Sequence, residues 1–486
     1  MNELSPQRKR IILATCCMSL LIVSMDATIV NVALPSIRRS FHADAADLQW
    51  VIDIYTLVLA TLLMLSGALA DRLGRRRVFQ VGLTIFALGS LLCSIAPTVG
   101  VLIGARLVQA IGGSMLNPVA MSIITQVFTD VKERARAVGM WGAVVGISMA
   151  IGPIVGGWLV DTVGWRSVFW INLPICAAAI ILTAIFVPES KSTTLRTLDP
   201  VGQLAFALFM AGAVFGLIEG PRNGWGTPMP VAAFTIAVVA MAVFIWYEHR
   251  VSDPFIDLRF FRSVPFSSAT AIAVCAFSSY GAFLFMMSIY MQNQRGWSAI
   301  DAGLMYLPIA VAALVLSPLS GRLVGRYGTR PSLLCSSVLM TVGAVGLVLM
   351  KDDSPIWQLL ITFFAFGAGF GMVNAPITTS AVGGMPRDRA GAASAVASTS
   401  RQLGVSIGVA LCGAVAGRAV AGHGDFTDYA RPLWWVTVAL AVLIGLIGMA
   451  STTGWAQHTR ESIGHLLAEP AGRPLVTAGS GGGRDA

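Results

Sequence analysis

The sequence predicts an all-α membrane protein with 14 transmembrane helices, arranged as two six-helix pseudo-symmetric bundles plus two inserted helices. Hydrophobic residues make up 56% of the 486 positions, charged residues only 12%, and the mean hydropathy is +0.75. A soluble chain of this composition would have too little polar surface to stay in solution. Apolar runs of about twenty residues fit a hydrocarbon core roughly 30 Å thick. A loop motif that occurs twice relates the two halves.

The apolar runs define the predicted domains. A cytoplasmic N-terminal segment, 1–10, precedes the first bundle, 11–187, and the two inserted spans with a cytoplasmic linker occupy 188–264. The second bundle, 265–455, is followed by a disordered cytoplasmic tail, 456–486. The predicted spans are 11–34, 47–70, 78–96, 99–127, 137–160, 167–187, 199–219, 229–248, 265–292, 300–321, 331–350, 355–380, 390–417 and 432–454.

Basic residues are distributed unevenly between the two sides of the predicted membrane. With the N-terminus inside, 23 of the 33 Lys and Arg residues lie in cytoplasmic segments, which is the positive-inside pattern. An even number of spans then places both termini in the cytoplasm. The net charge of +9 therefore reflects topology, and no nucleic-acid partner is expected. The seven cysteines have no metal-ligand spacing and are interpreted as small core residues.

The first span, which ends before a predicted external loop at 35–46, contains a single charge, Asp26. A central Asp costs roughly 2.5 to 3.5 kcal/mol to insert, so it is retained where it faces a wet cavity or a partner. A polar residue that only packs helices together is the alternative. Asp53 in the second span and Arg106 in the fourth lie at a similar depth, roughly 9–12 Å below the outer surface. The shared depth predicts that the three groups belong to one site.

The loop after the second span carries the densest motif of the chain, GALADRLGRRR at 67–77. Its glycines permit a tight reversal, and its arginines hold the loop in the cytoplasm. A merely basic inside loop would explain the arginines, but not the recurrence of the motif 254 residues later. Two six-span halves would repeat after about 200 residues, so the excess matches the two inserted spans. The equivalent pairs are Gly67 and Gly321, Leu69 and Leu323, Arg72 and Arg326, Gly74 and Gly328, and Arg76 and Arg330.

A parallel repeat of this kind is typical of a large transporter class with its substrate site at midplane between the halves. From residue 11 to 455 the chain resembles the major facilitator superfamily, in its fourteen-span drug:proton antiporter branch. The 67–77 loop matches the superfamily signature, and MDATIVNVALP at 25–35 matches the first-span motif of the branch. The resemblance implies that the loop latches a cytoplasmic gate. The gating residues it implies are Gly67, Asp71, Arg72, Gly74, Arg75 and Arg326.

Two further spans carry motifs of this family. The fourth span, with Arg106 and Gln109, is similar to the motif associated with proton coupling, and an arginine that only contacts helices is the alternative. The fifth span, with Gly152, Pro153 and Gly156, resembles the motif that marks exporters. Proline removes a backbone donor, and glycines four residues apart let a neighbouring helix approach closely. These three residues are therefore also assigned to gating.

The second half has no acid at mid-depth and offers aromatic and sulfur side chains instead. Aromatic faces attract organic cations and methionine adapts to varied shapes, although many of these side chains would face lipid or the core. Arg401, inside the thirteenth span, is left unexplained, with a gate contact as the open alternative. The residues expected to contact substrate are Asn31, Tyr55, Gln109, Asn117, Trp141, Phe277, Tyr280, Phe283, Tyr306 and Asn374.

The resemblance implies a proton-coupled antiporter of the bacterial cytoplasmic (inner) membrane that exports amphipathic drugs or antiseptics by alternating access, with Asp26, Asp53 and Arg106 in proton coupling. MDAT at 25–28 with WVIDIY at 50–55 looks like the subset that exports quaternary ammonium compounds, so cationic substrates are expected. Protons are the coupling ion, no cofactor or metal is expected, and the protein is expected to be monomeric in the lipid bilayer. The alternative is an exporter of an endogenous lipid, siderophore or self-made antibiotic. An enzyme is disfavoured because all five histidines lie in loops, at a span edge or in the tail.

Overall fold

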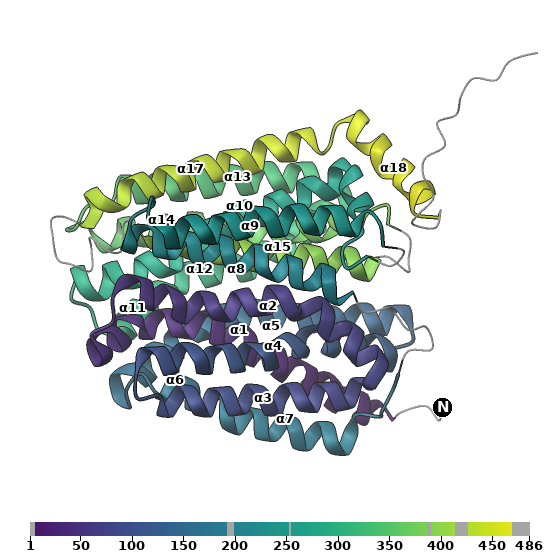
Figure 1. Cartoon of the computed structure of the whole chain (residues 1–486), viewed down its shortest axis with the longest axis horizontal. Helices are drawn as coiled ribbons and strands as arrows, with labels where there is room; N and C mark the ends of the chain where they lie inside the picture. Colours follow the sequence, from purple (N-terminus) through teal and green to yellow (C-terminus); the bar gives the residue numbers. More distant parts are fainter. Residues whose placement is uncertain (1–4, 192–198, 252–253, 386–389, 414–425, 469–486) are drawn as a thin grey trace, which may run out of the picture.

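The computed structural model describes residues 5–191, 199–251, 254–385, 390–413 and 426–468. These residues form helices and connecting segments without a strand (Figure 1). Twelve helical stretches among them are long and apolar enough to cross a membrane. The predicted all-α membrane fold is confirmed, whereas the count of fourteen is not, because the predicted fifth and thirteenth spans fall on helices outside these twelve.

Capping side chains lie at the start of four long helices in the first half, namely α1 (Pro6–Phe41), α2 (Ala45–Leu73), α4 (Val99–Val127) and α5 (Val131–Thr162). Ser5, Asp44, Thr98 and Asp130 each accept a hydrogen bond from a backbone N–H of the first turn, which satisfies donors that have no intrahelical partner. The other helices of this half are α3 (Arg75–Ile95), α6 (Ser167–Trp170) and α7 (Asn172–Phe186).

The rest of the chain contains the two inserted helices and the second half. The inserted helices are α8 (Pro200–Asn223) and α9 (Pro228–Glu248), and α8 packs against both α2 and α15. Gln203 of α8 donates to the carbonyl of Thr61 in α2 at 3.0 Å. The remaining elements are η1 (Leu258–Arg262), α10 (Val264–Ile289), η2 (Tyr290–Gln294), α11 (Ala299–Met305), α12 (Leu307–Tyr327), α13 (Thr329–Val348), α14 (Ile356–Val382), α15 (Ala390–Leu411), α17 (Phe426–Ala450) and α18 (Gly454–Ala468).

Helix α1 is longer than predicted, and the external loop expected from residue 35 is wrong up to Phe41. Pro35 lies inside the helix. Because proline has no N–H, the carbonyl of Asn31 loses its helical donor. The Ser288 hydroxyl of α10 donates to this carbonyl instead. A contact with the other half of the molecule therefore satisfies the oxygen that the proline leaves free.

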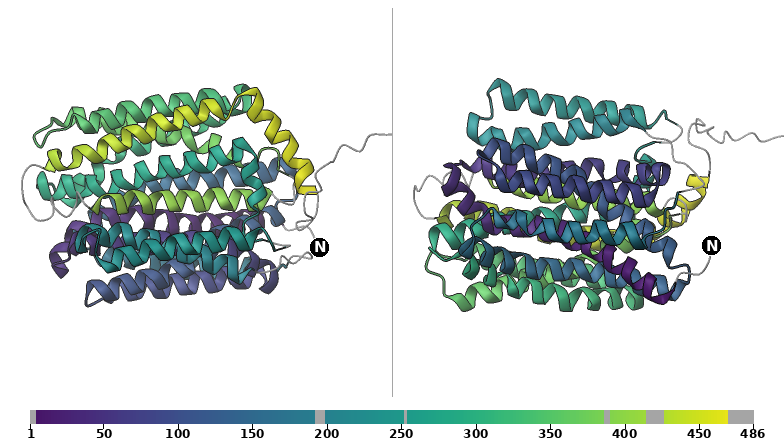
Figure 2. Two further views of the ribbon diagram at one scale, coloured as in Figure 1. Left: turned by 45° about the horizontal axis from the view of Figure 1, so that its top comes forward. Right: turned by 90° about the horizontal axis from the view of Figure 1, so that it is seen from below.

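The two halves lie side by side in Figure 1, and their helices remain roughly parallel to one another in both views of Figure 2. The N-terminus and α18 lie at one end of the helices, at the right of Figure 1, and this end is named the terminal end. Helices α6 and α11 lie at the other end, called the distal end. The membrane-spanning direction therefore runs from the terminal end to the distal end.

The tail predicted to be disordered from residue 456 is helical up to Ala468, so that prediction is wrong for this segment. Ala456 and Ile463 are fully buried and lie seven residues apart, on one face of α18. The Thr459 side chain accepts a hydrogen bond from the backbone N–H of Val264, at the start of α10, at 3.0 Å. One apolar stripe thus holds a mostly polar helix against the second half. The remainder of the predicted tail lies outside the described residues.

Candidate functional site

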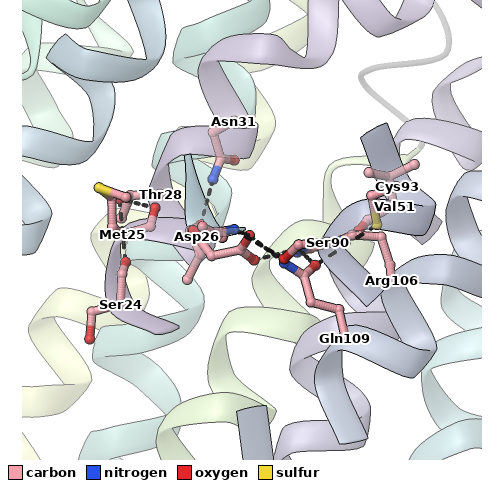
Figure 3. A network of polar contacts seen from close by, with 12 residues as sticks. Ser24, Met25, Asp26, Thr28, Asn31, Val51, Ser90, Cys93, Arg106 and Gln109 are labelled. Carbon is pink, nitrogen blue, oxygen red and sulfur yellow. Dashed lines mark hydrogen bonds and ion pairs between the residues drawn. The ribbon is translucent and has the colours of Figure 1, made fainter. Parts of the chain in front are cut away.

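Asp26 lies in α1 and forms an ion pair with Arg106 of α4, and both side chains are at most 1% exposed (Figure 3). Arg106 Nε also donates to the carbonyl of Val51 at 3.1 Å. The guanidinium carbon lies 4.1 Å from the centroid of the Tyr55 ring. Burying one of these charges without the other would cost several kcal/mol. The contacts therefore allow two charges to remain inside an apolar bundle, and the predicted association of Asp26 with Arg106 is confirmed.

Polar side chains from three helices complete the surroundings of the Asp26 carboxylate. Gln109 Nε2 donates to Asp26 Oδ1 at 2.8 Å and lies 2.8 Å from Ser90 Oγ of α3. Asn172 of α7 donates to the same carboxylate oxygen at 3.2 Å. Arg106 Nη1 donates to Gln109 Oε1 at 2.6 Å. Side chains from α1, α3, α4 and α7 therefore meet at one carboxylate. All of these side chains are buried from solvent.

Ser90 and Asn172 belong to this network but are not predicted from the sequence. Each is a polar residue inside a predicted apolar span, which is a weak signal because many such residues only bond to their own helix. Thr15 and Thr183, for example, donate to carbonyls one turn away. The order of helices in space is needed to bring Ser90 and Asn172 to Asp26, and spacing along the chain does not give that order.

Asp53 does not join the Asp26–Arg106 pair. Helix α2 directs it toward α15, where the Thr56 and Ser406 hydroxyls lie 2.6 Å from each other and beside the carboxylate. Asp53 is fully buried, and neither of its carboxylate oxygens has a hydrogen bond in the described part of the chain. The predicted single site of three charges is therefore divided. Asp26 and Arg106 lie within the first half, and Asp53 lies where the two halves meet.

Backbone carbonyls accept most of the hydrogen bonds that join the two halves. Gln292 Nε2, after α10, donates to the carbonyl of Val32 in α1 at 2.9 Å. Gln49 Nε2 of α2 donates to the carbonyl of Val409 in α15. In the described residues, the hydrogen bond between halves that lies nearest the terminal end joins the Thr399 hydroxyl to the carbonyl of Ala60, at 3.3 Å. The contacts thus begin at the distal end and extend to about the middle of the helices.

A third contact between the halves joins α5 to the short helix α11. Asp161 accepts hydrogen bonds from the backbone N–H groups of Ala299 at 3.2 Å and Ile300 at 2.7 Å. First-turn N–H groups have no intrahelical partner, and a carboxylate is favoured at that end of a helix. A Cβ atom on Gly157 would lie 2.4 Å from the carbonyl oxygen of Ala299, and one on Gly303 would lie 2.3 Å from the α5 backbone. Side chains are therefore excluded at both points of closest approach.

The 67–77 loop forms a tight connection at the terminal end. Gly74 has a φ of 111°, a backbone conformation that favours glycine. Asp71 and Arg75 form an ion pair at 3.0 Å, and Arg75 also donates to Gln126 of α4 at 3.1 Å. Glu189, after α7, accepts a hydrogen bond from the backbone N–H of Arg76 at 3.2 Å. The loop is thereby tied to two other elements of the first half.

The other predicted gating residues are distributed along both halves. Gly152 and Gly156 of α5 pack against Thr28 and Ile29 of α1, within one turn of Asp26. Close packing of α5 on α1 therefore supports the charged network. The remaining members are Gly67, opposite Pro118 of α4; Pro153, whose carbonyl faces Gly303; Arg72, half-buried near the end of α2; and Arg326, exposed near the end of α12.

Several residues predicted to contact substrate serve as internal packing or hydrogen-bonding groups. Tyr55 and Gln109 belong to the surroundings of Arg106, and Asn31 donates to the carbonyl of Ala27 at 3.0 Å. In the second half, Phe283 stacks on Phe366 with ring centroids 4.8 Å apart, and Tyr306 donates to the carbonyl of Leu284. The half-buried members are Asn117, Trp141, Phe277 and Asn374, and Tyr280 is buried against Phe370.

Two helical halves that meet around buried charges have the architecture of a secondary membrane transporter. The chain belongs to the Major Facilitator Superfamily, whose family model matches residues 16–409. The resemblance stated from the sequence is confirmed. This family and fold are those of membrane transporters of small molecules.

Relatives of the chain are bacterial proteins named for drug resistance. It is 38% identical to the multidrug resistance protein Stp of Mycobacterium tuberculosis over 398 residues, which cover 82% of this chain and 74% of that protein. It is 32% identical to the methylenomycin A resistance protein of Streptomyces coelicolor over 456 residues, covering 94% and 92%. Its fold is similar to that of a bacterial homologue of the human lysosomal transporter Spinster, with a TM-score of 0.63 and 18% identity over 94% and 99% of the two chains.

Proposed function

We propose that the protein is a proton-coupled antiporter that exports amphipathic small molecules from a bacterial cytoplasm across the inner membrane. The observation that carries the proposal is the sealed network around Asp26, in which one carboxylate offsets the buried charge of Arg106. Intramembrane charges of this kind mark ion pathways and proton relays. The names of the relatives, which include multidrug resistance protein and drug efflux pump, support export as the direction.

The electrostatics of this network support the proposed proton coupling. Protonation of Asp26 would remove the charge that offsets Arg106, while the guanidinium would still be buried. Breaking a buried pair in this way costs about 3–5 kcal/mol, which is enough to shift a conformational equilibrium between two states. Because both groups are at most 1% exposed, a proton reaches Asp26 only after the helices around it separate. Protonation of Asp26 is therefore coupled to separation of the helices around it.

The contacts between the halves support an alternating-access cycle. They lie from the distal end to the middle of the molecule, as expected for a state closed at that end. We place the terminal end in the cytoplasm because the 67–77 loop and the segment before residue 11 are rich in arginine. We also propose that α5 and α15 cross the membrane, which gives fourteen spans with both termini on the cytoplasmic side, and that the protein acts as a monomer.

Organic cations are the substrates we propose first, because the 25–28 and 50–55 motifs resemble those of quaternary ammonium exporters. Asp53 supports this class, since a substrate cation would offset the cost of burying a carboxylate that accepts no hydrogen bond from the described residues. A second candidate is export of an antibiotic made by the producing cell. Relatives named for resistance to methylenomycin A and for tetracenomycin C resistance and export favour it.

The test is uptake into proteoliposomes with an acidic interior, using ethidium as the cationic probe and methylenomycin A as the antibiotic probe. Accumulation of ethidium that collapses with the pH gradient would support the first candidate. Accumulation of methylenomycin A alone would favour the second. If protein-containing vesicles accumulate neither compound beyond protein-free vesicles, proton-coupled export of these classes is contradicted.

A further inference from the structure

Arg401 of α15 is a charged group in the second half that has no role in the site around Asp26 or in the proposed transport cycle. Its Nη2 donates to the Thr378 hydroxyl of α14 at 2.7 Å, and its Nε is buried without an acceptor among the residues that the structure describes. The guanidinium carbon lies 5.9 Å from the centroid of the Phe277 ring. Arg401 takes part in none of the ion pairs formed by the described residues. Among the described residues, the groups that contact its guanidinium are therefore the Thr378 hydroxyl and the Phe277 ring.

The comparison with Arg106 shows what Arg401 lacks. Arg106 is also inside a helix bundle, but Asp26, Gln109 and a backbone carbonyl accept its hydrogen bonds. Arginine presents five N–H donors in a planar fork that matches the geometry of a carboxylate. Burying part of a guanidinium, here its Nε, without an acidic partner carries a desolvation cost. An oxyanion brought from outside the chain would satisfy the donors and offset this cost.

The surroundings of Arg401 suit an aromatic or apolar body next to that oxyanion. Phe277 makes an edge contact with Phe370, with centroids 5.0 Å apart, and Phe370 stacks on Tyr280 at 4.3 Å. Arg401 is half-buried and Thr378 is exposed, so the donors are accessible from outside the packed core. Helix α15 is also one of the helices that contacts the first half. A planar acid with an aromatic ring could thus place its ring on the Phe277–Phe370 edge and its oxygens on Arg401.

We infer that Arg401, Thr378 and Phe277 form a binding subsite for an oxyanion, such as a carboxylate or an ionised enol, carried by an aromatic compound. The subsite deepens the proposed function, on which it rests, by adding acidic or zwitterionic compounds to its substrate class. Anionic lipid headgroups share this chemistry and are the second source to be tested.

The experiment measures binding of 2-naphthoate and of its neutral analogue 2-naphthamide to the full-length protein in phosphatidylcholine nanodiscs. The wild type should bind the carboxylate about tenfold more tightly, because a charge-assisted hydrogen bond contributes about 1.5–3 kcal/mol. Arg401→Gln should reduce this preference to within about twofold, and Arg401→Lys should give an intermediate value because it retains the charge without the fork. Arg431→Gln, at an exposed ion pair with Asp428, is the matched control and should retain the preference.

A second arm uses nanodiscs that contain phosphatidylglycerol and measures bound lipid by native mass spectrometry. Loss of bound phosphatidylglycerol in Arg401→Gln, without a naphthoate preference in the wild type, would assign the oxyanion site to a lipid headgroup. A preference that is unchanged in Arg401→Gln, or the absence of both kinds of binding in the wild type, would overturn the inference. Ethidium accumulation by the wild type reports the proposed function separately, so failure of transport and failure of the subsite are distinguishable.

Discussion

Asp26 and Asp53 lie in different chemical surroundings although their depth in the membrane is similar. Asp26 pairs with Arg106, accepts hydrogen bonds from two amide side chains, and is buried. Asp53 instead faces the Thr56 and Ser406 hydroxyls where the two halves meet. A carboxylate with a fixed cationic partner exchanges that partner only when the network opens. A carboxylate without a fixed cationic partner can bind a proton or a substrate cation, once the halves separate, without first giving up that partner. The two acids are therefore expected to contribute separately to transport.

Asp53→Asn tests this separation. If both acids release a proton per cycle, export of a monovalent cation moves one net charge inward, and the membrane potential adds roughly 2.3 kcal/mol per 100 mV. The variant should lose the response of ethidium uptake to an imposed potassium-diffusion potential while it retains some response to a pH gradient. Uptake into proteoliposomes with each gradient alone is the measurement. A voltage response equal to that of the wild type would mean that Asp53 does not carry the second proton.

The sequence locates the individual charges but not their partners. Asp26 and Arg106 are recognisable because each is a rare charge inside an apolar run, and their similar depth correctly predicts contact. Depth does not predict the partners of Asp53, because it does not specify the face of a helix, and α2 directs Asp53 away from Arg106. Ser90 and Asn172 are not predicted because the neighbours of α3 and α7 are known only after folding.

At the scale of the elements, the contact between α5 and α11 closes one end of the molecule. Asp161 bonds two backbone N–H groups of α11, and the glycine contacts bring the two backbones together. The other contacts between the halves depend mainly on hydroxyl or amide side chains. Asp161 thus provides a charged hydrogen-bonding group that would have to separate from its partners when the distal end opens.

Asp161→Asn should weaken closure of the distal end. The amide retains one acceptor but loses the charge, so we expect the closed state to lose about 1 kcal/mol, or roughly fivefold in its population relative to the open state. Labelling of a cysteine introduced at Gln292, beside α11, should become correspondingly faster. Asp301→Asn is the control, because the Asp301 carboxylate accepts a hydrogen bond from the hydroxyl of Ser298, the residue before α11. Equal labelling rates in wild type and Asp161→Asn would exclude a role in closure.

At the scale of the whole molecule, two related halves are joined by the inserted pair α8 and α9, with α8 in contact with both α2 and α15. The repeat of the 67–77 motif predicts two halves and also the position of the insertion. Apolar runs in the sequence locate the twelve candidate crossings of the described residues, although some helix ends differ from the prediction by several residues. They do not reveal that α1 continues through Pro35, because the Ser288 donor that satisfies the Asn31 carbonyl is distant in sequence. They also miss α18, whose apolar stripe is narrow.

The topology can be tested at α5, which is not among the twelve candidate crossings. Thr129 lies before α5 and is exposed, and Val163 follows it and is 71% exposed. If α5 crosses the membrane, a cysteine at Val163 should react with a membrane-impermeant maleimide in intact cells, and one at Thr129 only in inverted vesicles. Native cysteines are replaced beforehand. Reaction of both positions from the same side would show that α5 does not cross.

The central claim is that Asp26 couples protons to transport through its pair with Arg106, and Asp26→Asn tests it most directly. The amide is nearly isosteric with the carboxylate but cannot titrate. The measurement compares two reactions of the same proteoliposomes: exchange of labelled for unlabelled ethidium at equal pH, and accumulation of ethidium driven by a pH gradient. Exchange reports a folded carrier, because it requires binding and access to both sides but no net proton movement. The variant is expected to retain exchange and to lose accumulation. Accumulation at the wild-type level by Asp26→Asn would contradict the account.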